Sequence, residues 1–417
     1  MPETTAPAVR AIPPLADIEA ARTVVARVAQ PTPMETSRFL AEVLGSDVLL
    51  KLENLQRTGS YKIRGAYYRM SRLSDAEKAR GVVAASAGNH AQGVAFAARE
   101  LGIKATIFMP LGVALPKLQA TRDYGADVLL RGSTVEEPLQ AAAEYAAATG
   151  AVLIPPFDHP DVITGQGTLG LEIHDQAPDL DTIIVPIGGG GLISGVASAL
   201  KQRAALEGRS IRVIGVQAAN AAAYPVSLAN GVVTEIRTSA TIADGIAVAK
   251  PGLLNFEIIR ELVDEVVTVS EADIARAILV LLERAKLVVE PAGAVGVAAI
   301  LAGQVTGTGK TVVILSGGNI DPLLMQRVIS HGLAASDRYL KLKIMLPDRP
   351  GQLARTAEIV AEANANVIEV LHTRHGRGLQ LSQVELELSV ETRGPEHRAQ
   401  VVQKLRDAGY DPRLDSD

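Results

Sequence analysis

The stretch Thr182-Ile183-Ile184-Val185-Pro186-Ile187-Gly188-Gly189-Gly190-Gly191-Leu192 carries the strongest local signal in this chain of 417 residues. Its apolar run predicts a buried strand, and the pattern from Leu192 onward predicts a helix. The glycines between them let the backbone curl so that successive N–H groups face one anion at the start of the helix. A single phosphate suits such a turn, because the spacing matches neither the dinucleotide-binding fingerprint nor a P-loop.

Apolar runs of similar length recur along the chain and alternate with amphipathic stretches. The predicted strands are Val48–Leu52, Val82–Ala85, Ala105–Met109, Val128–Leu130, Thr182–Val185, Ile211–Val216, Val266–Val269 and Val312–Leu315. The predicted helices include Ala91–Glu100, Leu192–Leu206 and Glu271–Ala285. This alternation predicts an α/β domain with an open, mostly parallel sheet, which binds its ligands at the carboxyl ends of the strands.

The pattern changes after about residue 325. The predicted strands there are Leu340–Leu346, Val367–Arg374 and Leu379–Val390, with helices at Gln352–Ala363 and Pro395–Ala408 and a further strand at the end. We therefore predict a first domain over residues 1–325, a helix end and linker over 326–339, and a small βαββαβ domain over 340–417.

The composition excludes several classes of protein. A formal net charge of −5 argues against nucleic acid as the main partner. The absence of cysteine excludes disulfides and thiolate metal sites. The chain contains no apolar run near the roughly 20 residues that a membrane helix needs, and no signal segment, so we expect a cytoplasmic protein.

Four segments at predicted strand ends carry groups suited to chemistry. They are Thr58-Gly59-Ser60-Tyr61-Lys62-Ile63-Arg64-Gly65, Ser86-Ala87-Gly88-Asn89-His90, Gly188-Gly189-Gly190-Gly191 and Ser316-Gly317-Gly318-Asn319. Taken one at a time, each also fits an ordinary surface lysine, a capped turn or a glycine turn. Together they offer an amine, an amide, a phosphate cradle and a hydroxyl, which is the set of partners that pyridoxal phosphate requires.

In this order the segments resemble the fold-type-II pyridoxal-phosphate enzymes, the tryptophan synthase β-like group, and within it the threonine deaminases. The resemblance implies open, mostly parallel sheets in two subdomains, with Lys62 forming the Schiff base. It further implies that Asn89 bonds the phenolic oxygen of the cofactor and that Ser316 meets the pyridine nitrogen. The loop Gly188–Gly191 would bind the phosphate, and the substrate carboxylate would lie against Ser86, Ala87, Gly88, Asn89 and His90.

Serine racemases share most of this pattern, and three positions separate them from this chain. Racemases of the group have a second serine at the position of Ala87, which serves as the acid–base on the opposite face. They bind a divalent cation through acids at the positions of Gln217 and Ala223, so we predict no metal here. These departures favour β-elimination of L-threonine to 2-oxobutanoate and ammonia, and of L-serine to pyruvate.

Other readings stay open at this point. A serine or threonine racemase, or another lyase of the same fold, is the nearest alternative. A sensor without activity would require a lost Lys62 or a broken glycine loop, and both are intact.

The tail resembles an ACT-like amino-acid-sensing domain through Leu346-Pro347-Asp348-Arg349-Pro350-Gly351. Its effector is open among isoleucine, valine and other amino acids, or the domain serves assembly only. The enzyme would act in either isoleucine biosynthesis or threonine catabolism. The resemblance also implies a homo-oligomer, a tetramer.

Overall fold

The computed structural model describes residues 12–134, 136–307, 309–335, 337–374, 379–380 and 382–414. The chain divides into two compact units, Met1–Leu324 and Met325–Asp417, which we call the first unit and the tail unit.

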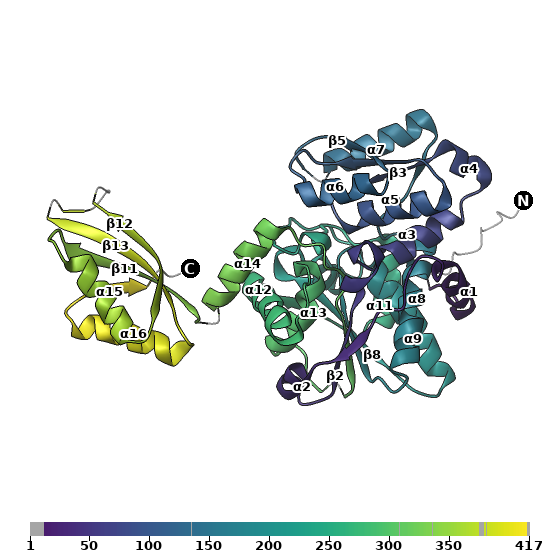
Figure 1. Ribbon diagram of the computed structural model, residues 1–417. Coiled ribbons are helices and arrows are strands. Elements are labelled where there is room, and N and C mark those ends of the chain that lie inside the picture. The colour runs from purple at the N-terminus through teal and green to yellow at the C-terminus, as the bar shows by residue number, and fades with distance from the viewer. Residues whose placement is uncertain are drawn as a thin grey trace, which may run out of the picture. The chain divides into compact units, whose positions relative to one another are not determined.

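The first unit is built on two open sheets (Figure 1). The strands of the larger sheet, in spatial order, are β1 Met34–Thr36, β2 Val48–Lys51, β10 Thr311–Ile314, β7 Thr182–Pro186, β8 Arg212–Ala218 and β9 Glu265–Val269. The strands of the smaller sheet are β5 Asp127–Leu130, β4 Ala105–Met109, β3 Val82–Ala85 and β6 Val152–Leu153. All neighbouring strands in both sheets are parallel except β1, which pairs with β2 in the antiparallel direction. The predicted α/β class with mostly parallel sheets is thereby confirmed.

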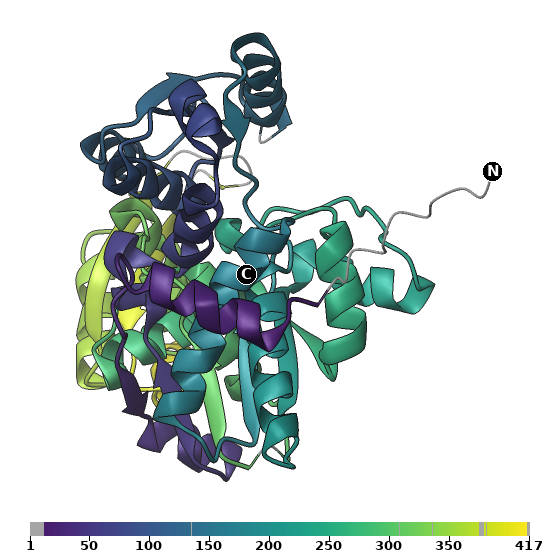
Figure 2. The same cartoon turned by 90° about the vertical axis from the view of Figure 1, so that its right-hand side faces the viewer.

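Helices cover both sheets. They are α1 Leu15–Val25, α2 Arg38–Leu44, α3 Lys62–Ser71, α4 Asp75–Arg80, α5 Asn89–Leu101, α6 Leu115–Asp123, α7 Glu136–Thr149, α8 Pro160–Gln176, α9 Gly191–Leu206, α10 Ala223–Asn230, α11 Leu253–Leu262, α12 Glu271–Val280 and α13 Pro291–Leu301. A further helix, α14 Pro322–Ala335, begins at the end of the first unit and lies mostly in the tail unit. Short helical turns are η1 Glu53–Leu55, η2 Arg57–Gly59, η3 Ala219–Ala221, η4 Asp244–Ile246 and the π-helix η5 Leu281–Ala285. Figure 2 shows α1, in dark purple, crossing the front of this unit, where it packs on α3, α8 and α9.

A buried ionic network fixes the start of α3. The guanidinium of Arg64 donates to both carboxylate oxygens of Glu53 at 2.8 Å and to Glu172 at 2.8 Å. The amine of Lys51, which has no exposed side-chain surface, bonds the other oxygen of Glu172. Because unpaired charges are costly to bury, this pairing ties β2, η1 and α8 to the first turn of α3.

The tail unit is a four-stranded antiparallel sheet in the order β12 Asn366–Thr373, β13 Gln383–Glu391, β11 Tyr339–Pro347 and β14 Pro412–Leu414. Its helices are α15 Gln352–Glu362 and α16 Pro395–Asp407. Alternate residues of β11, from Leu340 to Leu346, are buried in a core of their own. The element order is the βαββαβ order predicted from the sequence.

The structure differs from the predicted elements at a few places. Strands β1 and β6 were not predicted, because they are only 3 and 2 residues long and not buried in an alternating pattern. The helix predicted over Glu271–Ala285 leaves α-geometry after Val280 and ends as a π-helix. The strand predicted over Leu379–Val390 begins only at Gln383, and Ser382 precedes it in a turn. Within the described parts of the chain, no helix combines the length and apolar character that crossing a membrane requires.

Candidate active site

Lys62 is the first residue of α3, and its side chain is partly buried. Its Nζ donates to the backbone carbonyl of Pro156 at 2.9 Å and lies 5.3 Å from the centre of the Tyr61 ring. Burial lowers the pKa of Lys62 to about 8, although the nearby carboxyl of Glu290 acts in the opposite direction. A substantial fraction of this amine is therefore neutral near physiological pH and able to act as a nucleophile or a base.

The Ser316 segment lies directly against the lysine segment. The backbone N–H of Tyr61 donates to the carbonyl of Ser316 at 3.2 Å, and Ser60 forms an isolated antiparallel bridge with Gly317. Ser316 is buried, with 4% of its surface exposed, at the carboxyl end of β10. Two of the predicted segments, 261 residues apart at Thr58 and Asn319, are thus brought together.

Asn89 begins α5, at the carboxyl end of β3, and faces the same place. Its Nδ2 donates to Oε1 of Glu290 at 2.6 Å, and its Oδ1 accepts from Asn319 at 2.8 Å. Burial raises the pKa of Glu290 to about 7, and Asp244 adds to the rise, while Lys117, Asn89 and Lys62 oppose it. Glu290 therefore gains or loses its proton in the physiological range.

The predicted carboxylate loop is Ser86–His90, and its residues Ser86–Asn89 are half-buried at the turn from β3 into α5. Ser86 Oγ accepts from the backbone N–H of Gly88 at 3.1 Å, which shapes the turn. His90 is different, because it is 4% exposed and its Nε2 lies 2.9 Å from the carbonyl of Ile154. Burial, together with Lys62, lowers the pKa of His90 to about 3, so its ring is neutral and acts as a structural tie.

The glycine loop joins β7 to α9 and is crowded on all sides. A Cβ on Gly189 would lie 2.4 Å from the ring of Phe157, and one on Gly190 would lie 2.2 Å from the hydroxyl of Tyr224. Gly190 also has a φ of +101°, a conformation that favours glycine. The hydroxyl of Tyr224 donates to the carbonyl of Gly189 at 3.0 Å, which holds the loop in place.

One short segment links the glycine loop to the lysine. Pro156 accepts the hydrogen bond from the Lys62 amine, and the next residue, Phe157, packs against Gly189 and Gly191. The carboxylate of Asp158 then caps the start of α11 by accepting from the backbone N–H of Leu253 and Leu254 at 2.9 and 3.0 Å. The structure thus brings together all four predicted segments.

Sequence reasoning missed several residues of this site. Pro156, Phe157 and Tyr224 were not singled out. The segment Glu290-Pro291-Ala292-Gly293 resembles one beside the cofactor in the family, but a proline at a helix start accounts for it equally well. A run of four glycines is consistent with large side chains packed against the loop, but the sequence does not identify those side chains.

Comparison with known proteins identifies the chain's relatives. Residues 25–317 match the family model described as pyridoxal-phosphate dependent enzyme. The chain belongs to this family. Residues 341–409 match the ACT domain.

Ammonia-lyases and racemases are among the proteins to which the chain is similar. The L-threonine ammonia-lyase of Thermotoga maritima is 46% identical over 400 residues, which are 96% of this chain and 99% of the relative. The processed threonine deaminase isoform 2 of Solanum lycopersicum is 38% identical with a TM-score of 0.71, covering 76% of this chain and 93% of that one. Maize serine racemase is 35% identical with a TM-score of 0.72, covering 78% and 98%. The dependence on pyridoxal phosphate and the fold-type-II class, both predicted from the sequence, are confirmed.

Gln217, at a racemase cation position, is fully buried, and its side-chain amide forms hydrogen bonds with the backbone. Its Oε1 accepts from the backbone N–H of Tyr224 at 2.9 Å, and its Nε2 lies 3.4 Å from the carbonyls of Ile187 and Ala221. The neutral amide thereby supports the segment that leads into the glycine loop. Among the described residues, no cluster of three or more His, Asp or Glu side chains has the arrangement of a metal site.

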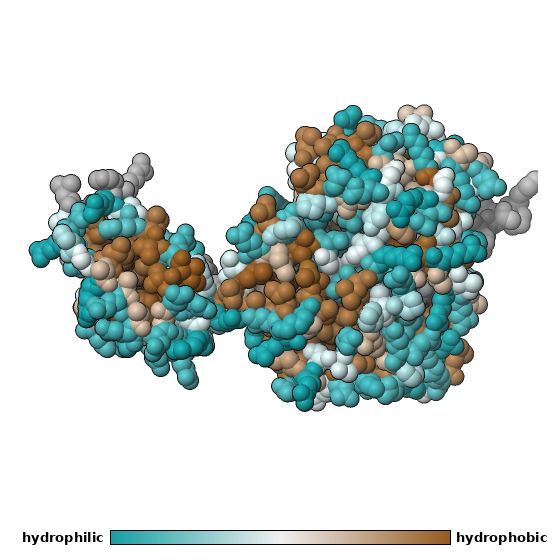
Figure 3. Space-filling model, viewed as in Figure 1, coloured by the Kyte–Doolittle hydropathy of each residue, from teal (hydrophilic) through white to brown (hydrophobic). Residues whose placement is uncertain are grey.

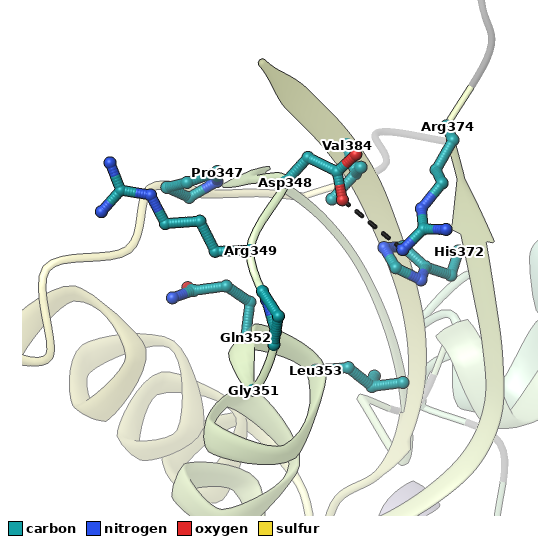
Figure 4. Close-up of a pocket in the computed structure, with 10 residues that line it drawn as sticks. Pro347, Asp348, Arg349, Gly351, Gln352, Leu353, His372, Arg374 and Val384 are labelled. Atoms are coloured by element: carbon teal, nitrogen blue, oxygen red, sulfur yellow. Dashed lines mark ion pairs between the residues drawn. The ribbon is translucent and has the colours of Figure 1, made fainter.

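The tail unit contains a pocket of about 310 Å³ at the turn from β11 into α15 (Figure 4). Asp348 and Arg374 form an ion pair there at 3.5 Å, and Figure 4 shows the guanidinium of Arg349 pointing away from that pair. Gly351, with a φ of +88°, caps the start of α15. The free backbone N–H groups of the first turn of the helix lie at this end. Leu353 and Val384 supply apolar lining.

Proposed function

We propose that this enzyme deaminates L-threonine by β-elimination, giving 2-oxobutanoate and ammonia, and L-serine in the same way, giving pyruvate. The observation that carries the proposal is the Lys62 amine, whose pKa burial lowers to about 8 and which bonds the carbonyl of Pro156, next to the Phe157 ring that packs against the glycine loop. The relationship to threonine ammonia-lyases over nearly the whole chain supports the substrate.

The site fits pyridoxal phosphate by its donor set. The loop Gly188–Gly191 opens α9 with backbone N–H groups and the positive end of the helix dipole, and it has no room for side chains. Lys62 would hold the aldehyde, Asn89 the phenolic oxygen and Ser316 the ring nitrogen. When bound, the cofactor supplies an electron sink for charge that develops at the substrate Cα.

The residues of the chain supply proton transfer and orientation. The Lys62 amine would take the Cα proton of the substrate, because its lowered pKa leaves part of it neutral near physiological pH. The N–H groups and hydroxyl of Ser86–Asn89 bind the substrate carboxylate at the start of α5. Ser316 offers a neutral hydroxyl, which does not force the ring nitrogen to keep a proton and so favours prompt loss of the β-hydroxyl.

Ala87 decides between elimination and racemisation in this proposal. Racemisation needs a second group that returns a proton on the opposite face, and the methyl of Ala87 cannot do so. Elimination needs Lys62 as the base and a proton for the departing hydroxyl, but no group that returns a proton to Cα. A racemase remains the alternative that the products would reveal.

The tail pocket is proposed as the site of an amino-acid effector. The start of α15 and Arg374 suit a carboxylate, Asp348 suits an ammonium group, and Leu353 and Val384 suit an apolar side chain. A zwitterion would offer each member of the existing ion pair an opposite charge.

Assembly as a homo-oligomer is supported by the exposed apolar surface. Figure 3 shows hydrophobic surface on the tail unit. The large apolar side chains exposed in that unit are Leu353, Ile368, Val370, Leu371 and Leu414. Three of them lie on β12, an edge strand, and such strands are prone to pair with another chain. A tetramer and a cytoplasmic location stay predictions.

The decisive experiment measures 2-oxobutanoate from L-threonine with purified protein loaded with pyridoxal phosphate. We expect rapid formation in the wild type and loss of at least about a thousandfold in Lys62→Ala, because Lys62 would both hold the cofactor and act as the base. Near-normal turnover in Lys62→Ala would refute the assignment. Interconversion of L- and D-serine without keto acid would favour the racemase.

A further inference from the structure

A chain of hydrogen bonds crosses the candidate active site. The side-chain amide of Asn319 donates to the carbonyl of Thr58 at 2.7 Å and to Oδ1 of Asn89 at 2.8 Å. Asn89 in turn donates to Oε1 of Glu290 at 2.6 Å. The four residues come from η2, the loop after β10, the start of α5 and the residue before α13, so the chain pins together four separate segments.

Two glycines make room for this chain of bonds. A Cβ on Gly59 would lie 2.3 Å from Oδ1 of Asn319. A Cβ on Gly317 would lie 2.3 Å from Oε1 of Glu290 and 3.0 Å from Nδ2 of Asn89. The side chains are therefore held closely, and any residue larger than glycine at either place would displace them.

The polarity of the bonds fixes which way the Asn89 amide points. If that amide were turned by half a revolution, its NH₂ group would face the NH₂ group of Asn319. Its carbonyl oxygen would then face Oε1 of Glu290. The first contact would set two donors against each other, and the second would set two acceptors against each other whenever Glu290 is ionised, whereas the observed orientation satisfies both. One N–H proton of Asn89 is then left over from the hydrogen bonds found among the described residues.

We propose that Asn319 and Glu290 are positioning residues, which hold the Asn89 amide so that its remaining N–H proton is available to the cofactor. The inference rests on the proposed function, because it takes Asn89 as the partner of the phenolic oxygen. In this role Asn319 acts through Asn89 and touches neither substrate nor cofactor.

The test compares Asn319→Asp with the wild type. The substitution keeps the shape but removes both N–H donors, so the Asn89 amide loses its fixed orientation. A donor stabilises an ionised oxygen, and its loss raises the pKa at which the absorption band of the bound cofactor titrates. We also expect the apparent Kd for pyridoxal phosphate to rise about tenfold, as for loss of one buried hydrogen bond. Asn230→Asp, at an exposed amide that bonds Thr234, adds the same charge elsewhere and serves as the matched control.

A second pair of variants separates positioning from proton transfer. Glu290→Gln keeps an acceptor oxygen for Asn89, so we expect the titration of the absorption band to stay as in the wild type. Glu290→Leu removes the acceptor and should shift the titration as Asn319→Asp does. If Asn319→Asp does not fold, Asn319→Ser removes the same amide without adding charge, and the same shifts in the titration and the Kd are expected.

Two results would overturn the inference. One is a wild-type titration and Kd in both Asn319→Asp and Glu290→Leu. The other is a spectral change that appears only in proportion to a lower melting temperature of the cofactor-free protein, which would indicate a general structural role. Failure of the wild type itself to bind pyridoxal phosphate at Lys62 would instead refute the proposed function, and it would be seen before any variant is made.

Discussion

The lysine site and the tail pocket differ in how firmly their polar groups are held. At the lysine site, Asn89 has partners on both sides of its amide, and the glycine loop is packed against Phe157 and Tyr224. In the tail pocket, the Asp348–Arg374 pair is 3.5 Å long, with side chains 40% and 61% exposed. Preorganised groups suit chemistry, in which small displacements are costly, whereas loosely held groups can rearrange around a ligand. The contrast suggests that the first site is built for catalysis and the second for response.

Among the tests of this contrast, the largest expected effect comes from breaking the packing of the glycine loop. Gly190→Ala would place a Cβ 2.2 Å from the Tyr224 hydroxyl, at a φ of +101°. Because the loop must shift, we expect the Kd for pyridoxal phosphate to rise about a hundredfold, measured by equilibrium dialysis. Gly208→Ala is the matched control, since Gly208 has a φ of +67° but open space around its Cα. Equal rises in Kd for the two substitutions would show that alanine at a positive φ weakens cofactor binding in general, and that crowding at Gly190 is not the cause.

The next effect tests the state of the Lys62 amine through pH. Below its pKa the amine is protonated and cannot attack an aldehyde, so attachment of pyridoxal phosphate to the cofactor-free enzyme should slow as pH falls. With a pKa of about 8, the rate should drop about tenfold per pH unit below that value and level off above it. Stopped-flow absorbance measures this rate, with Nα-acetyl-lysine as the reference for an exposed amine. A rate that keeps rising to pH 10 would mean that burial does not lower the pKa of Lys62.

The tail pocket should respond more weakly, because its groups are exposed. Arg374→Ala removes the cation of the ion pair, and we expect the effector concentration for half-maximal response to rise about tenfold. Arg349→Ala removes a guanidinium that points away from the pair, and it should change this concentration less than twofold. Candidate effectors are screened by the change in 2-oxobutanoate formation. An equal shift in both variants would argue for general electrostatic attraction instead of a specific contact.

The sequence was informative where one segment alone determines the outcome. The run from Thr182 to Gly191 predicted a strand, a phosphate loop and a helix start, and β7 and α9 lie there in the structure. The strand predicted over Leu379–Val390 is present as β13, although it begins only at Gln383.

The sequence was uninformative where partners are far apart. Asn89 and Glu290 are separated by 201 residues, and nothing near Glu290 distinguishes a site residue from the start of a helix. Similarly, Phe157 follows two prolines in a loop without periodicity. Its side chain nevertheless leaves no room for a Cβ at two positions of the phosphate loop, which must therefore be glycine. Such contacts depend on the tertiary fold, and pattern reasoning does not reach them.

Removal of divalent metal is expected to have the smallest effect. The position of Gln217 holds an acid in racemases of the group, where a cation would balance its charge. Here the neutral amide accepts from Tyr224 N–H at 2.9 Å and lies near two backbone carbonyls, so the segment before the glycine loop is supported without a cation. We therefore expect EDTA to change the rate of 2-oxobutanoate formation by less than twofold, and added Mg²⁺ to restore nothing. The double substitution Gln217→Glu with Ala223→Asp should introduce sensitivity to EDTA, because two buried carboxylates then need a counter-charge. A wild-type enzyme that loses its activity in EDTA and regains it with Mg²⁺ would show that a cation binds elsewhere and that the amide is not its replacement.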